Sequence, residues 1–412
     1  MIALLALAMT ASMDSQMNHS SEAERLTDKI ISTFYDRKDK IWKPQKASSE
    51  SVGMQGYTLW TSLLAWQAMI EGAKVNPEKW KPKLGEFYDV LEQYYSKDEH
   101  AYAAWLNFPG MDDFYYDDNV WAVIACMEAY EITGEQRYKA RALDIFDHFV
   151  VKGWDDSNAP GGMRWGTKLG YEDRADRTVS ATAGAALANL LLAKFDDPAE
   201  RRAWSKRALD WINSKVRADS GLIYDGFKAP GFERMPTIWT YNTGVPIRAS
   251  VEYYRQTGNK KYLNWAKKMG DASIDRSLSP MFDGAVSDHE NRYWYDSTFF
   301  VHYLVDGLRE LSLVTKDDRY TKESRREALY IYKYIKDSDG LYFRSMRLWQ
   351  IDEKRLKLFH QLTGESDRKL SPDSSERSYE PSEMEKPVGE RETVKTLLAN
   401  AGTARMFWLL SH

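Results

Sequence analysis

The chain has 412 residues, of which 43% are hydrophobic and 29% are charged, the composition of an ordinary globular protein with room for a large core. Lys and Arg total 57 and Asp and Glu total 61, so a net charge of −4 argues against a nucleic-acid or membrane-surface binder, which would carry a basic excess. The single cysteine, Cys126, excludes an internal disulfide framework and four-cysteine or Cys2His2 zinc sites.

The first twelve residues, Met1 to Ser12, form an apolar run that ends in small side chains, as in a signal peptide, although the usual preceding basic residues are missing. The run is too short to span a bilayer as a helix. We predict that residues 1–20 are a signal peptide or a disordered N-terminus and that the protein is secreted or periplasmic. No other stretch is long and apolar enough for a membrane helix, so we expect no membrane span.

Apolar residues then recur with helical spacing along almost the whole chain. Leu59, Leu63, Trp66 and Ile70 form one apolar stripe, and similar stripes follow up to the C-terminus. The pattern predicts twelve helices, which begin near residues 22, 54, 78, 117, 135, 177, 198, 241, 259, 294, 319 and 391.

Related polar turns recur roughly every 60 residues, which indicates an internal repeat of helix pairs. The segments 130–138 (YEITGEQRY) and 254–262 (YRQTGNKKY) are alike, and Gly134 and Gly258 suit the left-handed cap that ends a helix.

Twelve helices in pairs fit either a closed ring of six pairs, the (α/α)6 barrel, or an open solenoid. Long aromatic-rich loops alternate with short polar turns, which favours an all-α toroid with elaborated loops on one face. We therefore predict a single (α/α)6 catalytic domain over residues 21–412. Residues 363–391 are rich in Ser, Glu, Pro and Lys, and predict a mobile loop before the last helix.

Common catalytic motifs are absent: the chain has no GxSxG, HExxH, GxGxxG or phosphate-binding loop. The seven His residues form no ligand pattern, so we expect no metal and no cofactor. The chain does have 55 aromatic residues (15 Trp, 25 Tyr and 15 Phe), which fit equally an aromatic core or a cleft that stacks on sugar rings.

The adjacent carboxylates Asp117 and Asp118 stand among aromatic residues immediately before an apolar helix. A helix N-terminus stabilises one carboxylate, and a neighbouring carboxyl resists ionisation beside it, so its pKa rises. One ionised and one protonated carboxyl group are what glycoside hydrolysis uses. The alternative interpretation of the pair is simple capping of the helix.

The chain resembles glycoside hydrolase family 76, the endo-α-1,6-mannanases, over about residues 25–315. The resemblance rests on four segments in the expected order: YDDNVW at 116–121, WDD at 154–156 with GGMRW at 161–165, GLIYDG at 221–226, and TIWTYNTG at 237–244. The family fold is an (α/α)6 barrel. The resemblance implies a retaining mechanism in which Asp117 is the nucleophile and Asp118 is the general acid/base.

The same segments supply the candidate substrate-binding residues, which are Tyr116, Asn119, Trp121, Trp165, Trp239, Tyr241 and Asn242. For each aromatic side chain, packing in the core is an equally good interpretation. The chain departs from the family pattern at Ala122, where a second Trp is frequent, at Thr243, where Gln is expected, and in the segment 177–184, which lacks Asn. These departures bear on the substrate subsites more than on the aspartates.

The sequence thus predicts a monomeric hydrolase that acts on a polysaccharide or oligosaccharide, with α-mannan as the expected substrate and no nucleic-acid partner. Three alternatives stay open: a transglycosylase that uses the same site, another (α/α)6 enzyme such as an unsaturated uronyl hydrolase or a sugar epimerase, and a helical toroid that binds glycans without catalysis.

Overall fold

The computed structural model describes residues 17–46, 58–106, 113–167, 172–378 and 380–412. Most of the predicted signal segment lies outside this range, and the first helix begins at His19, within the segment 1–20. Among the described residues, no helix is long and apolar enough to cross a membrane.

Within the described residues, six helices form an inner ring: α3 (Leu59–Val75), α5 (Tyr116–Thr133), α7 (Val179–Leu192), α9 (Thr240–Thr257), α11 (Thr298–Thr315) and α15 (Leu397–Leu409). Six more pack outside it: α2 (His19–Phe34), α4 (Pro77–Leu91), α6 (Gln136–His148), α8 (Pro198–Lys215), α10 (Lys260–Ile274) and α12 (Arg319–Tyr330). All of α7 is buried, whereas its outer partner α8 buries only part of its surface. The predicted (α/α)6 barrel is confirmed.

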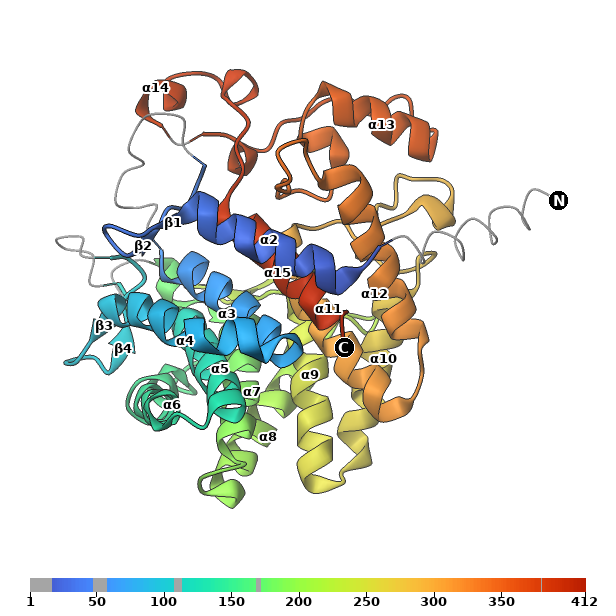
Figure 1. Cartoon of the computed structure of the whole chain (residues 1–412). Coiled ribbons are helices and arrows are strands. Elements are labelled where there is room, and N and C mark those ends of the chain that lie inside the picture. The colour runs from blue at the N-terminus through green and yellow to red at the C-terminus, as the bar shows by residue number, and fades with distance from the viewer. Residues whose placement is uncertain (1–16, 47–57, 107–112, 168–171, 379) are drawn as a thin grey trace.

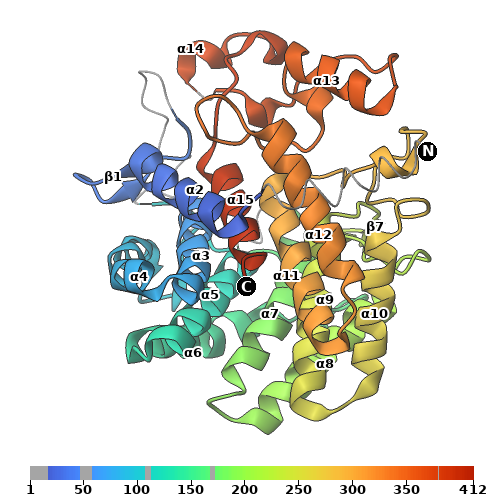
Figure 2. The ribbon, with the colours of Figure 1, turned by 45° about the vertical axis from the view of Figure 1, so that its right-hand side comes forward.

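The two ends of the described chain close the ring. Five helix pairs are hairpins, but the sixth combines the first outer helix, α2, with the last inner helix, α15, which lie against each other (Figures 1 and 2). The indole nitrogen of Trp408 on α15 donates a hydrogen bond of 3.0 Å to the Thr27 hydroxyl on α2. The last inner helix, α15, therefore closes the ring between α11 and α3.

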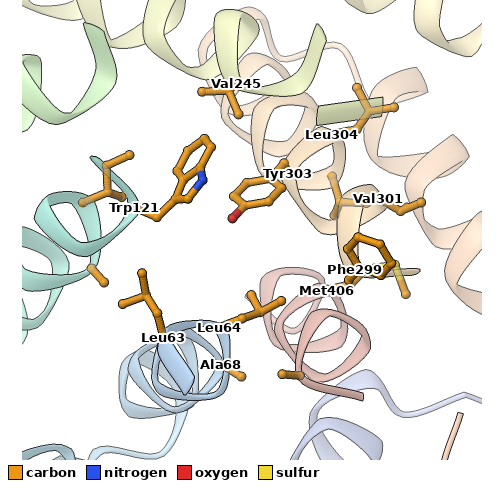
Figure 3. Close-up of a cluster of buried hydrophobic side chains, with 14 of the residues drawn as sticks. Leu63, Leu64, Ala68, Trp121, Val245, Phe299, Val301, Tyr303, Leu304 and Met406 are labelled. Carbon is orange, nitrogen blue, oxygen red and sulfur yellow. The ribbon is translucent and has the colours of Figure 1, made fainter. Parts of the chain in front are cut away.

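Apolar side chains fill the axis of the barrel. Side chains from α3, α5, α9, α11 and α15 converge there, and Trp121 faces Tyr303 (Figure 3) with ring centroids 4.7 Å apart. Helices α9 and α11 approach so closely that a Cβ atom on Gly244 would lie 2.4 Å from the Leu304 Cα. This close packing explains a glycine in the first half of α9, where a larger residue would force the helices apart.

The long connections all lead into the N-terminal ends of the inner helices, and the short turns lie at the opposite ends. Within the described residues, four of them carry strands, which form three small antiparallel sheets: β1 (Tyr35–Asp36) with β2 (Ile41–Trp42), β3 (Tyr95–Ser96) with β4 (Ala101–Tyr102), and β5 (Arg177–Thr178), β6 (Gly226–Lys228) and β7 (Glu233–Met235), with β6 in the centre. The predicted elaborated face is thus the face at which six inner helices begin.

The connection before α15 contains two helices that the sequence pattern did not predict, α13 (Glu353–Thr363) and α14 (Pro381–Met384). Within the predicted mobile loop 363–391, Glu376 and Arg377 are buried, and Arg377 donates a hydrogen bond of 2.9 Å to the Ile351 carbonyl. These contacts hold the middle of the segment against an earlier part of the same connection, and the mobility of the remainder stays a prediction. The last inner helix begins six residues later than predicted, because Thr396 caps it by accepting from the Ala399 amide.

A buried charge network crosses the barrel. Asp306 on α11 accepts hydrogen bonds of 2.7 Å from both Arg248 on α9 and Arg405 on α15. Arg248 also pairs with Glu128 on α5, and Arg405 lies 3.5 Å from Glu71 on α3. Burial alone would raise the pKa of Asp306, but the two guanidinium groups outweigh it and lower the pKa to about 2. The network therefore joins five of the six inner helices through ionised side chains.

We expect Asp306→Ala to destabilise the fold by about 3–5 kcal/mol, because it leaves two buried guanidinium groups without their shared carboxylate. Urea unfolding followed by Trp fluorescence measures the change. The control is Asp318→Ala, whose carboxylate pairs with Lys322 at the exposed surface and should change the midpoint little. Equal unfolding midpoints for the two variants would contradict a structural role for the network.

Candidate active site

A cleft of about 370 Å³ opens on the elaborated face. The first turns of five inner helices line it, with Trp60 from α3, Asp117, Asp118 and Trp121 from α5, Ser180 from α7, Tyr241 from α9, and Phe300 and Tyr303 from α11. Loops and strands add Thr58, Ala104, Trp105, Tyr115, Trp165, Asp176, Thr178, Asp225 and Met235. Because helix N-termini carry the positive ends of the helix dipoles, this end of the barrel favours negative charge.

Asp117 lies in the first turn of α5 and is held by three hydrogen-bond donors. Its Oδ2 accepts from the Trp165 indole and from the Ser180 hydroxyl, each at 2.9 Å, and its Oδ1 accepts from the Asp118 amide at 3.0 Å. Burial raises the pKa of Asp117 to about 6, and these donors keep it from rising further because they stabilise the charged form. Asp117 is thus a carboxylate fixed in one orientation.

Asp118 has very different surroundings. Among the described residues, no donor forms a hydrogen bond to its carboxyl group. Burial, and then the negative charges of Asp117 and Asp113, raise the pKa of Asp118 well above its usual value. At pH values above the pKa of Asp117 and below that of Asp118, the pair therefore holds one proton, and Asp118 carries it.

Aromatic rings form much of the wall around this pair. Trp60 stacks on Phe300 at a centroid distance of 5.9 Å and an interplanar angle of 27°, and Tyr241 packs against Phe300 at 4.5 Å. On the other side Trp165 lies against Tyr115 at 4.8 Å. Flat apolar faces beside carboxylates suit sugar rings, which have apolar faces and polar edges.

Five of the predicted site residues line the cleft, namely Asp117, Asp118, Trp121, Trp165 and Tyr241. The others do not. Tyr116 is buried against Phe149, on which its ring stacks at 4.8 Å, so it faces away from the cleft. Asn119 is fully buried and clamps β4, accepting from the Tyr102 amide at 2.8 Å and donating to the Tyr102 carbonyl at 3.0 Å.

The two remaining candidates, Asn242 and Trp239, lie next to the cleft and contact residues that line it. Asn242 is fully buried and donates a hydrogen bond of 3.0 Å to Asp225, and Trp239 contacts the cleft-lining Phe300 at 5.7 Å. Asp225 also accepts from the Tyr241 hydroxyl at 2.8 Å. Burial raises the pKa of Asp225, and the two donors work against this effect.

Sequence reasoning missed several cleft residues. Asp225 belongs to the segment 221–226, which the resemblance already singled out, and its carboxylate was the available signal. Ser180 and Asp176 lie in and beside the segment 177–184, but their place opposite α5 depends on the barrel. Trp60 and Trp105 were not among the candidates, because the spacing of aromatic residues along a helix or loop does not tell which ring faces a cavity.

Two of the three departures from the family pattern lie in the packing, whereas the third, the segment 177–184, supplies Thr178 and Ser180 to the wall of the cleft. Ala122 and Thr243 are both fully buried side chains outside the cleft lining. The Thr243 hydroxyl accepts a hydrogen bond of 3.3 Å from the Ile223 amide, and so supports the loop that carries Asp225. These two changes therefore leave the surface that meets a ligand unaltered.

A barrel whose mouth combines adjacent carboxylates with aromatic walls is the arrangement of a carbohydrate-active enzyme. The chain belongs to glycosyl hydrolase family 76, whose model it matches over residues 19–339. It is 25% identical to the meiotically up-regulated gene 191 protein of Schizosaccharomyces pombe (strain 972 / ATCC 24843), over 96% of this chain and 92% of that protein.

Solved structures share the fold. A family 76 α-mannanase from Bacteroides thetaiotaomicron superimposes with a TM-score of 0.75 at 15% identity, covering 97% of both chains. An inactive variant of the α-1,6-mannanase from Salegentibacter sp. HEL1_6, in complex with α-1,6-mannotriose, gives a TM-score of 0.69 at 17% identity, covering 95% of this chain and 99% of that one. In that variant two consecutive aspartates are replaced by asparagine.

We expect Ser180→Ala to raise the pKa of Asp117, because it removes one of the three donors that stabilise the ionised form. The pKa is measured from the carboxyl ¹³C chemical shift of the aspartates as a function of pH. Ser180→Thr keeps a hydroxyl group at this position and should leave the value close to that of the parent. A pKa that falls or stays constant in Ser180→Ala would show that the hydroxyl does not stabilise the carboxylate.

Proposed function

We propose that this protein is a retaining, endo-acting α-1,6-mannanase, with Asp117 as the nucleophile and Asp118 as the general acid/base. The observation that carries the assignment is the contrast between the two neighbours: three donors hold Asp117, whereas Asp118 has a raised pKa and no donor among the described residues. Membership of family 76 supports the reaction class. The mannotriose complex of the inactive Salegentibacter variant supports the substrate class and the use of two consecutive aspartates.

The proposed reaction has two displacement steps. Asp117 attacks the anomeric carbon, and the bond between that carbon and the glycosidic oxygen breaks. Asp118 gives its proton to the departing oxygen in the same step. Asp118 then takes a proton from a water molecule, whose oxygen attacks the anomeric carbon and releases Asp117. A sugar hydroxyl in place of water would give transglycosylation at the same site. Trp165 and Ser180 keep the nucleophile in place during both steps.

The chemistry of the cleft favours a neutral sugar over the other (α/α)6 substrates. Among the described residues that line it there is no Lys, Arg or His, whereas four are carboxylates: Asp117, Asp118, Asp176 and Asp225. A uronic acid would be repelled by the ionised Asp117 and would find no Lys, Arg or His among these lining residues to pair with. An epimerase of the type that relies on His would lack its base. Neutral mannosyl units instead offer hydroxyl groups that carboxylates can bind.

We further propose that the protein acts as a monomer outside the cytoplasm. The apolar run at residues 1–12, which ends in small side chains, supports export. Expression of the full chain in a bacterial host, followed by fractionation and N-terminal sequencing, tests the proposed export. Cleavage within residues 1–20 with activity in the exported fraction is expected, and a retained, uncleaved chain would contradict export.

Replacing either aspartate by asparagine should abolish the release of short manno-oligosaccharides from linear α-1,6-mannan, as measured by product chromatography. Asp219→Asn, an exposed aspartate outside the cleft, is the matched control and should retain full activity. Products from all three variants would show that other carboxylates carry the reaction. Mannan binding without turnover by the parent chain would favour a binding protein.

The two roles are separable with an aryl α-mannoside whose leaving group needs no proton. Asp118→Asn should cleave it far better than it cleaves mannan, and added azide should accelerate turnover, because azide needs no general base. Asp117→Asn should stay inactive both on the aryl α-mannoside and after addition of azide. The reverse pattern would exchange the two assignments.

The pH dependence of kcat/KM should be bell-shaped, because Asp117 must be ionised and Asp118 protonated. Activity is lost on the acidic side as the pair takes up a second proton and on the alkaline side as it loses its last one, so the two apparent pKa values belong to the pair. Initial rates on mannan across the pH range test this. An activity that stays constant as Asp118 ionises would contradict its role as the acid.

A further inference from the structure

Two histidines and an aspartate meet on the outside of the barrel, away from the cleft. His100 lies in the turn between β3 and β4, and Asp144 and His148 lie one helical turn apart at the C-terminal end of α6. Asp144 Oδ1 is 2.7 Å from His100 Nδ1 and 3.5 Å from His148 Nδ1. The two imidazole rings stack with centroids 4.6 Å apart and an interplanar angle of 25°.

We propose that His100, Asp144 and His148 form a binding site for Zn²⁺, with water as the fourth ligand. One ligand atom from each residue lies within 4.8 Å of the other two. Metal–ligand bonds of about 2.0–2.2 Å place the ligand atoms of tetrahedral zinc about 3.3 Å apart. The two distances to Asp144 fall on either side of that value. His148 Nδ1 also lies 3.0 Å from the Asp144 backbone carbonyl, so the imidazole must give up this hydrogen bond when it turns toward the ion.

The surroundings of Asp144 orient it for this task. Its other oxygen, Oδ2, accepts a hydrogen bond of 3.0 Å from Arg141 and another from the Tyr95 hydroxyl. Because these two donors hold Oδ2, Oδ1 faces the two imidazoles. Hydrogen bonds of this kind commonly orient carboxylates that bind a metal.

The local charge also permits a cation. Arg141 places a positive charge beside Asp144, but Glu92 accepts two hydrogen bonds from the same guanidinium, at 2.6 and 3.1 Å. With neutral imidazoles, the group therefore keeps one uncompensated negative charge. Two nitrogen ligands suit Zn²⁺, whereas Ca²⁺ requires six to eight oxygen ligands and should not bind.

The turn between β3 and β4 sets the position of the His100 side chain. The φ of His100 is 55°, in the left-handed region, as is the φ of 52° of Lys40 at the corresponding position of the β1–β2 hairpin. This conformation turns the hairpin so that the imidazole reaches α6. The same hairpin continues from β4 to Trp105 in the wall of the cleft, so a bound ion would tie that wall to α6 without taking part in the reaction.

Isothermal titration of the full chain, made without a polyhistidine tag and freed of metal with a chelator, tests the site. One Zn²⁺ per chain should bind, Ca²⁺ should not, and Zn²⁺ should raise the melting temperature. His148→Ala, at the exposed end of α6, should weaken zinc binding by at least about 10-fold. His100→Ala and Asp144→Asn should do the same, with folding checked by circular dichroism.

The matched control is His289→Ala, which removes an exposed histidine far from this cluster in the sequence and should bind Zn²⁺ as the parent does. Substitution of Co²⁺ should give the intense visible absorption of a tetrahedral site in the parent and in His289→Ala, and not in His148→Ala. A parent chain that binds no zinc would overturn the proposal. Equal zinc affinity in the parent and in the folded His148→Ala variant would overturn it as well.

Discussion

The shared carboxylate of Asp306 is the interaction on which the barrel most depends. A ring of six apolar helices has no intrinsic register, because apolar packing is tolerant of sliding and rotation. Two arginines from different helices converge on Asp306, and their other partners reach two further helices. Because an unpaired buried charge is so costly, this network favours one rotation, about their own axes, of the five inner helices that it joins.

That fixed rotation determines what stands at the mouth of the barrel. All six inner helices begin at the elaborated face, so their first turns, amide groups and positive dipole ends surround one space. The side chains of Asp117, Ser180 and Tyr241 come from three such turns and meet across it. A carboxylate pair that would otherwise repel itself is accommodated there, and the difference in hydrogen bonding between its members supports two chemical roles for two identical side chains.

The cleft differs from the rest of the surface in its side chains, because histidines and cations are absent from its described lining. The described lining contains acids, alcohols and aromatic rings but no cation, which suits a neutral glycan. The departures from the family pattern at Ala122 and Thr243 are buried packing changes, so they bear on the support of the loops more than on ligand contact. The histidine cluster lies at the turn of the β3–β4 hairpin, which leads on to Trp105 in the wall of the cleft.

The sequence by itself determined the number and order of the barrel helices, the acidic pair and the alternation of long loops with short turns, because helical periodicity and helix-start chemistry are local properties. It missed α13 and α14 and assigned Tyr116, Asn119 and Asn242 to the ligand, because a side chain at a helix start looks the same whether it faces a cleft or a neighbouring element. Only the tertiary structure decided that α2 pairs with α15, that Ser180 and Trp165 bond to Asp117, and that His100 meets His148. Each of these contacts joins residues far apart in the chain: α2 meets α15 because the ring closes, and the other residues meet because neighbouring helices and their loops pack together, which no local pattern records.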